Sequence, residues 1–120
     1  MAKVLIIDDE ASIRTLLRLV LEGEGHEITE ASNGCTGLVS YQCDPADLVI
    51  VDIRMPEMNG LELILALTRE FLDAKVIAIS GEADANDTLS TAKLLGARHI
   101  LRKPFRLKTL LSSVRYELAH

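Results

Sequence analysis

The sequence predicts a doubly wound α/β fold in which five parallel strands alternate with five helices. Three strongly apolar segments, KVLII at 3–7, DLVIV at 47–51 and KVIAI at 75–79, are typical of strands that are buried on both faces. Segments with apolar residues at helical spacing lie between them. The length of 120 residues, with 48% hydrophobic and 26% charged residues, suits one globular domain with one core.

The first half of the chain contains two strand–helix pairs. The strand 3–7 leads into an amphipathic helix that ends near Gly23 and Gly25. The apolar face of this helix consists of Ile13, Leu16, Leu17, Val20 and Leu21. HEITEA at 26–31 is a short, partly polar strand, which predicts a place near the edge of the sheet. NGCTGLVSY at 33–41 predicts a weak helix, because its two glycines lower helix stability.

The second half repeats the alternation. After the strand 47–51, Asn59 and Glu62 have the spacing of a capping box, which predicts the start of a helix over 60–72. The strand 75–79 precedes a shorter helix over about 84–95, and HILR at 99–102 is the last strand. The apolar face of the last helix consists of Leu107, Leu110, Leu111, Val114 and Leu118.

Four of the strands are followed by a polar, reactive side chain. Asp8 and Asp9 follow the first strand, Asp52 the third, Ser80 the fourth and Lys103 the fifth. Ligands of open α/β sheets bind outside the carboxyl ends of the strands, where the strand order changes direction. With the strand order 2-1-3-4-5, the first and third strands are neighbours, so the three aspartates are expected to share a pocket with the serine and the lysine beside it.

Carboxylates that share a pocket raise one another's pKa unless a cation is present. Oxygen ligands suit a hard divalent cation such as Mg²⁺, which commonly shares its site with a phosphate. A carboxylate in such a site can form an aspartyl phosphate, with Lys103 holding the anion. Each residue also has an ordinary interpretation. The aspartates could cap a helix or a turn, Ser80 could belong to a turn, and Lys103 could be a surface lysine. Their joint occurrence at four strand ends favours a site.

The chain resembles the response-regulator receiver domains of two-component signalling over essentially its whole length. The segments that carry the resemblance are LIIDDE, LVIVDIRMPEMNGLEL, VIAISG and LRKPF. The resemblance implies a flavodoxin-like (βα)5 fold with the strand order 2-1-3-4-5, and a single receiver domain over residues 1–120. It implies a signalling phosphoacceptor that promotes its own phosphorylation and dephosphorylation, not an enzyme that turns over a substrate.

The resemblance also implies roles for the acidic residues. Asp52 matches the phosphoacceptor, Asp9 the carboxylate that binds Mg²⁺ directly, and Asp8 the one that usually acts through water. Arg54 matches the position whose backbone carbonyl completes the metal ligands together with Asp52. Arg54 and Glu82 also occupy positions that tune the dephosphorylation rate in the family.

Further roles concern the phosphoryl group and the loops around it. Ser80 matches the hydroxyl that bonds the phosphoryl group, and Lys103 matches the family's lysine, with a cis peptide to Pro104. Pro56 and Gly60 match the loop after the phosphoacceptor. This loop is expected to turn the backbone away from the strand while one carbonyl reaches back to the metal.

One position departs from the family pattern. Ile100 stands where the family usually has Tyr or Phe, so burial of a rotating aromatic ring is not available to transmit activation. His99 lies next to it and is expected to face the other side of the sheet, because strand residues alternate. A receiver-like module that works without phosphorylation is the alternative, and Ile100 is its only support.

The resemblance implies a sensor histidine kinase or a phosphotransfer protein as the phosphodonor. A downstream protein or output domain is expected to contact residues 84–120, and the same surface serves equally for a homodimer. The basic side chains expected on that surface are Lys93, Arg98, Arg102, Arg106 and Lys108. A solvated helix surface is the plainer interpretation of these residues, and direct binding of nucleic acid is not expected.

Other classes of protein are disfavoured. The sequence DDE after the first strand would repel the phosphate of a flavin, and Arg54 stands where aspartate-nucleophile phosphatases have a second aspartate. No apolar run approaches the roughly 20 residues that cross a membrane, and Met1 leads directly into the first strand, so a cytoplasmic protein is expected. Cys35 and Cys43 are too far apart along one helix for a disulfide and are interpreted as reduced packing residues.

Overall fold

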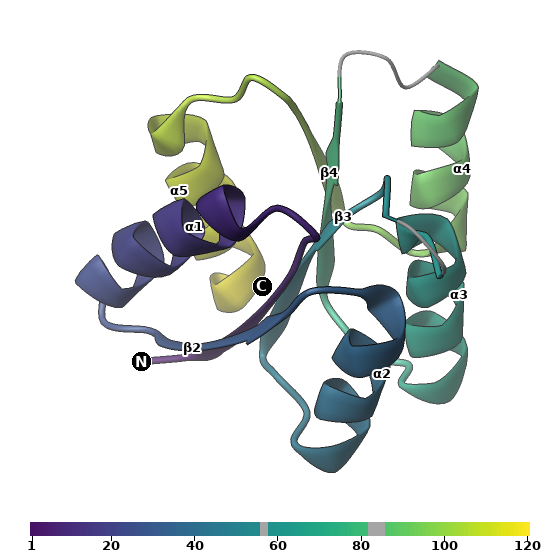
Figure 1. The fold of residues 1–120 in the computed structure, drawn as a ribbon, viewed down its shortest axis with the longest axis horizontal. Helices are drawn as coiled ribbons and strands as arrows, with labels where there is room; N and C mark the ends of the chain where they lie inside the picture. The colour runs from purple at the N-terminus through teal and green to yellow at the C-terminus, as the bar shows by residue number, and fades with distance from the viewer. Residues whose placement is uncertain (56–57, 82–85) are drawn as a thin grey trace.

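The protein is described by a computed structural model covering residues 1–55, 58–81 and 86–120, and for residues 86–89 the backbone alone. Strands and helices alternate along the chain (Figure 1). The strands are β1 (Lys3–Ile7), β2 (Glu27–Ala31), β3 (Leu48–Asp52), β4 (Val76–Ser80) and β5 (His99–Arg102). The helices are α1 (Ala11–Gly23), α2 (Gly34–Cys43), α3 (Gly60–Glu70), α4 (Asn86–Leu95) and α5 (Leu107–Ala119).

The five strands form one parallel sheet in the order β2-β1-β3-β4-β5, which confirms the predicted fold and strand order. Ile7 at the end of β1 pairs with Ala31 on one side and Val51 on the other. Asp52 pairs with Ile79, and Ser80 with Arg102. This register brings the carboxyl ends of β1, β3, β4 and β5 to the same edge of the sheet.

Helices cover both faces of the sheet. Figure 1 shows α1 and α5 on one face and α2, α3 and α4 on the other. Val4 and Ile6 of β1 belong to the core cluster that contains residues of α1 and α5, whereas Leu5 and Ile7 belong to the cluster that contains residues of α3. Because alternate strand residues point to opposite faces, a strand buried on both sides must be apolar throughout, which explains the continuous apolar segments.

The element boundaries differ slightly from those predicted. Asn59 caps α3 as expected, since its side chain accepts a hydrogen bond from the Glu62 N–H at 3.0 Å. The helix ends at Glu70 and not at 72, because Phe71 has an extended backbone. β4 begins and ends one residue later than predicted, and includes Ser80. Of the predicted helix 84–95, the described part begins at Asn86.

The prediction that both cysteines are packing residues is wrong. Cys35 and Cys43 are free thiols on α2, and both are exposed. The buried residues of this helix are Gly34, Gly37 and Tyr41. A side chain at Gly37 would collide with Ile7 of β1, so the helix lies close to the sheet along its glycine face and the cysteines point elsewhere.

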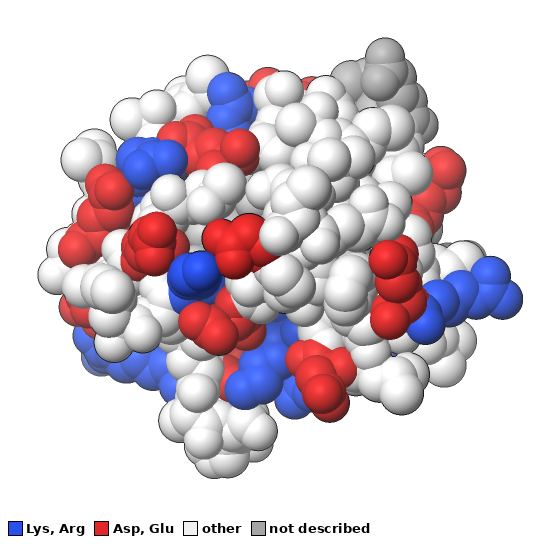
Figure 2. Space-filling view, turned by 90° about the horizontal axis from the view of Figure 1, so that it is seen from below, with Lys and Arg blue, Asp and Glu red and all other residues white. Residues whose placement is uncertain are grey.

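The charged surface is mixed. Figure 2 shows acidic and basic side chains interspersed on the face seen from below. Part of the basic group near the C-terminus has local partners, since Lys93 Nζ donates to the Arg98 carbonyl at 2.9 Å and the Arg98 guanidinium lies 3.7 Å from Glu117. Among the described residues, no helix combines the length and the apolar character needed to span a membrane.

Candidate functional site

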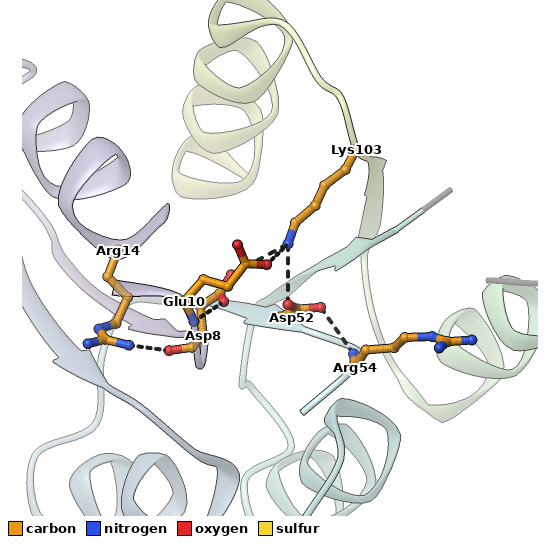
Figure 3. Close-up of polar contacts among 6 residues, drawn as sticks. All are labelled: Asp8, Glu10, Arg14, Asp52, Arg54 and Lys103. Atoms are coloured by element: carbon orange, nitrogen blue, oxygen red, sulfur yellow. Dashed lines mark hydrogen bonds and ion pairs between the residues drawn. The ribbon is translucent and has the colours of Figure 1, made fainter. Parts of the chain in front are cut away.

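The polar residues predicted at the strand ends gather at one edge of the sheet. Asp8 follows β1, Asp52 and Ser80 are the last residues of β3 and β4, and Lys103 follows β5. Asp8, Asp52 and Ser80 are buried, with exposed fractions of 1%, 4% and 0%. Figure 3 shows the Lys103 side chain reaching from the end of β5 toward the carboxylates.

The Lys103 ammonium lies among three carboxylates. Its Nζ is 3.3 Å from Asp52 Oδ2, 3.4 Å from Glu10 Oε1 and 4.0 Å from Asp8 Oδ2 (Figure 3). Glu10 was not predicted from the sequence as a residue of the site. Its position as the third acid of DDE was the available signal. The single positive charge is therefore shared, and it does not neutralise the carboxylates around it.

Backbone hydrogen bonds fix the end of β3. The Ile53 N–H donates to the Ile79 carbonyl at 2.9 Å, and the Arg54 N–H donates to Asp52 Oδ1 at 3.0 Å. The Gly60 N–H then donates to the Ile53 carbonyl at 2.8 Å. A Cβ atom at Gly60 would lie 2.5 Å from both the backbone carbonyl oxygen of Asp52 and the Cα of Ile53. Only glycine therefore lets the start of α3 lie this close to the end of β3.

The end of β5 is tied to the end of β4. The Lys103 N–H donates to the Ser80 carbonyl at 2.7 Å, and the predicted cis peptide between Lys103 and Pro104 is confirmed. The Ser80 hydroxyl is buried and has no hydrogen-bond partner among the described residues. The structure thus brings Ser80 to the site, while its predicted contact with a phosphoryl group stays a prediction.

Burial controls the ionisation of the two inner aspartates. It raises the pKa of Asp8 to about 6, helped by the charge of Asp52 and opposed by the Glu10 N–H and Lys103. Burial also raises the pKa of Asp52, against the Arg54 N–H and Lys103. For Lys103, burial lowers the pKa, but the charges of Asp52 and Asp8 outweigh it, so that the pKa lies above its ordinary value. The site therefore has more negative charge than its cation can compensate.

The acidic residues fit a divalent cation. Carboxylate oxygens of Asp8, Asp9, Glu10 and Asp52 lie within 4.8 Å of one another. Asp8 Oδ2 is buried and has no hydrogen-bond partner among the described residues. Oxygen donors of this kind suit Mg²⁺, which accepts carboxylates and keeps several waters. The three predicted aspartates are thus brought together, with Asp9 and Glu10 at the exposed rim.

The other predicted residues have mixed outcomes. The Arg54 N–H donates a hydrogen bond to Asp52. The role of the Arg54 backbone carbonyl as a metal ligand stays a prediction. Pro56 and Glu82 lie outside the described residues. Ile100 packs against the core cluster that contains α3, whereas His99 Nδ1 lies 2.6 Å from Glu117 Oε2 of α5. The two side chains therefore face opposite sides of the sheet, as predicted.

Comparison with known proteins gives consistent matches. Residues 4–115 match the family model described as the response regulator receiver domain. A probable transcriptional regulatory protein of Picosynechococcus is 37% identical to this chain. The aligned region covers 95% of this chain and 48% of that relative. The KDP operon transcriptional regulatory protein KdpE of Escherichia coli is 35% identical, covering 98% of this chain and 52% of the relative. The chain thus spans about half the length of these curated relatives.

Solved structures of similar length match the whole fold. A response regulator receiver domain protein from Clostridium thermocellum has a TM-score of 0.90 and 30% identity, covering 99% of this chain and 95% of that one. The chemotaxis protein CheY4 of Vibrio cholerae has a TM-score of 0.88 and 30% identity, covering 97% of this chain and 98% of that one.

Proposed function

Because the chain belongs to the response regulator receiver domain family, we propose that it accepts a phosphoryl group on Asp52 from the phosphohistidine of a sensor histidine kinase or a phosphotransfer protein. The observation that carries this proposal is the buried Asp52 carboxylate, 3.3 Å from Lys103 and beside three further acidic residues. The family and the geometry together give a receiver domain with an acidic pocket that suits a phosphoacceptor.

The proposed reaction transfers one phosphoryl group. A carboxylate oxygen of Asp52 attacks the phosphorus, the P–N bond of the phosphohistidine breaks, and the released imidazole keeps the electron pair and takes a proton from solvent. The Lys103 ammonium and the Ser80 hydroxyl donate hydrogen bonds to the phosphoryl oxygens. Hydrolysis of the acyl phosphate by water returns Asp52 to its starting state.

Magnesium is the proposed cofactor. Asp8, Asp9 and Asp52 would hold it together with the backbone carbonyl of Arg54, and Glu10 lies close enough to add a further carboxylate. When bound, Mg²⁺ supplies positive charge that stabilises the phosphoryl oxygens during transfer. Asp8 Oδ2, a buried oxygen that has no hydrogen-bond partner in the described part of the chain, supports this assignment.

We propose that residues 1–120 form a single receiver domain, either acting alone or as part of a longer regulator. The names of the curated relatives, transcriptional regulatory proteins of about twice this length, support the second arrangement. The proposed output is a change in the surface of residues 84–120, which binds a downstream protein, an output domain or a second copy. The domain itself is not proposed to bind nucleic acid, and its proposed location is the cytoplasm.

The test is intact-mass spectrometry after incubation with a small phosphodonor. The wild type is expected to gain one phosphoryl adduct in the presence of Mg²⁺ and none after chelation. Asp52→Asn should gain none, whereas Asp44→Asn, an exposed carboxylate outside the site, should match the wild type. A wild type that is folded by circular dichroism but gains no adduct would favour an interaction module that works without phosphorylation.

A further inference from the structure

An arginine outside the acidic cluster holds the backbone of Asp8. Arg14, on the first turns of α1, donates from Nη1 to the Asp8 carbonyl at 2.6 Å (Figure 3). Its Nε lies 3.1 Å from Glu30 Oε1 on β2. The side chains of Arg14 and Glu30 are only 18% and 26% exposed, so this contact is partly shielded from water. The arginine therefore connects the strand beside β1 to the residue that begins the site.

The hydrogen bonds of Asp8 leave one oxygen for the site. Its N–H donates to the Ala31 carbonyl at 3.1 Å, its carbonyl accepts from Arg14, and its Oδ1 accepts from the Glu10 N–H at 2.9 Å. Oδ2 is buried and has no hydrogen-bond partner among the described residues. Three polar atoms are thus held while the fourth lies among the carboxylates. The carbonyl that Arg14 contacts belongs to the peptide group that joins Asp8 to Asp9, the two neighbouring acidic residues of the site.

We propose that Arg14, held by Glu30, is a positioning residue that sets the affinity of the acidic site for Mg²⁺. The inference rests on the proposed function, because it assumes that the site binds this cation. Groups that hold metal ligands from outside typically affect metal affinity or activity by about 10- to 100-fold. The contacts described for Arg14 are to the Asp8 carbonyl and to Glu30, and not to the acidic side chains of the site. Its proposed contribution is therefore the orientation of the Asp8–Asp9 backbone.

A purely structural role is the competing explanation. Arg14 and Glu30 could simply fasten α1 to β2, in which case their loss would weaken folding without changing the cation site. Arg18 separates the two explanations. Its Nε lies 2.5 Å from Glu30 Oε2, so it also joins α1 to β2, but the contacts described for it are to Glu30 and Glu22. Arg18→Gln is therefore a matched control for Arg14→Gln.

The experiment measures the unfolding temperature as MgCl2 increases, at constant ionic strength, in protein first freed of metal by a chelator. A ligand that binds only the native state stabilises it by RT ln(1 + [L]/Kd), so fitting the curve gives the Kd for Mg²⁺ without any phosphorylation step. For Arg14→Gln, this Kd is expected to rise about tenfold. For Arg18→Gln it should stay within about twofold of the wild type, because Asp8 is not contacted.

Other outcomes would overturn the inference. If Arg14→Gln and Arg18→Gln both lower the unfolding temperature but keep the wild-type response to Mg²⁺, Arg14 only joins α1 to β2, and the proposal is wrong. If Arg14→Gln does not fold, Glu30→Gln replaces it as the test variant. It leaves Arg14 in place without its charged partner and should raise the Kd for Mg²⁺ as well. A Glu30→Gln curve identical to the wild type would refute the proposal. A wild type that does not respond to Mg²⁺ would overturn the proposed function itself, and the inference with it.

Discussion

Replacing Asp8 by asparagine is expected to stabilise the metal-free protein near neutral pH. Asp8 is 1% exposed, and burial raises its pKa from 3.8 to about 6. An acid whose pKa rises on folding binds more protons in the native than in the unfolded state between these values. The free energy of unfolding therefore decreases, through this one group, as the pH rises from about 4 to about 6, and the decrease remains at higher pH. Asparagine removes the charge and keeps an oxygen that can accept the Glu10 N–H.

The magnitude follows from the two pKa values. The interval from 3.8 to about 6, at about 1.36 kcal/mol per pH unit, corresponds to a cost of about 3 kcal/mol for the ionised side chain at pH 7.5. At pH 4, where the native side chain is mostly protonated, the cost falls to about 0.5 kcal/mol. For a domain of this size, about 3 kcal/mol corresponds to roughly 10 °C in unfolding temperature.

The assay is urea unfolding, followed by circular dichroism, in chelator at pH values between 4 and 7.5. Asp8→Asn should exceed the wild type by about 2 to 3 kcal/mol at pH 7.5 and by much less at pH 4. Asp9→Asn, the same charge change at the exposed neighbour, should alter stability by no more than about 0.5 kcal/mol at either pH. A gain for Asp8→Asn that is absent at pH 7.5, or that is the same at every pH, would refute the reasoning.

Two further substitutions test the surroundings of the site. Gly60→Ala should cost about 2 kcal/mol or more and slow phosphorylation, because the new Cβ would lie 2.5 Å from backbone atoms of Asp52 and Ile53. Gly23→Ala, where no atom lies within 4 Å, should change stability by less than about 1 kcal/mol, and equal effects of the two in urea unfolding would contradict this. Glu117→Ala should cost about 2 to 3 kcal/mol by the same measurement, because it removes a 3% exposed carboxylate that contacts His99. Asp44→Ala, which breaks the exposed pair with Lys3, should cost about 0.5 kcal/mol or less, and a loss as large as that of Glu117→Ala would count against burial as the cause.

The part of the site that lies on strand ends could be predicted from the sequence. A strand buried on both faces gives a continuous apolar segment, and the polar residue at its end is easily identified. The parallel order then places Asp8, Asp52, Ser80 and Lys103 at one edge, as the register confirms. These positions depend on backbone topology alone, so no side-chain conformation had to be known.

The part that depends on long side chains could not be predicted. Glu10 contacts Lys103, which is 93 residues away in sequence, and Arg14 contacts Glu30 across two elements. Both residues lie at the polar start of α1, where the sequence pattern shows only that they are not core residues. The prediction that the cysteines are packing residues was wrong for a related reason. Their separation along one helix excluded a disulfide and left packing as the interpretation, but the face that α2 buries is set by the close approach of Gly37 to Ile7.

The cost of burying Asp8 and the proposed role of the site have one physical cause. Strands covered on both faces leave their terminal carboxylates with little water, so negative charge there opposes folding. Lys103 cannot remove this cost, because its one charge is divided among three carboxylates at 3.3 to 4.0 Å. A cost of about 3 kcal/mol is a large fraction of the 5 to 15 kcal/mol that typically stabilises a domain. A cation that binds the native site would offset it by mass action, so the resistance of this protein to unfolding should report the state of its acidic pocket.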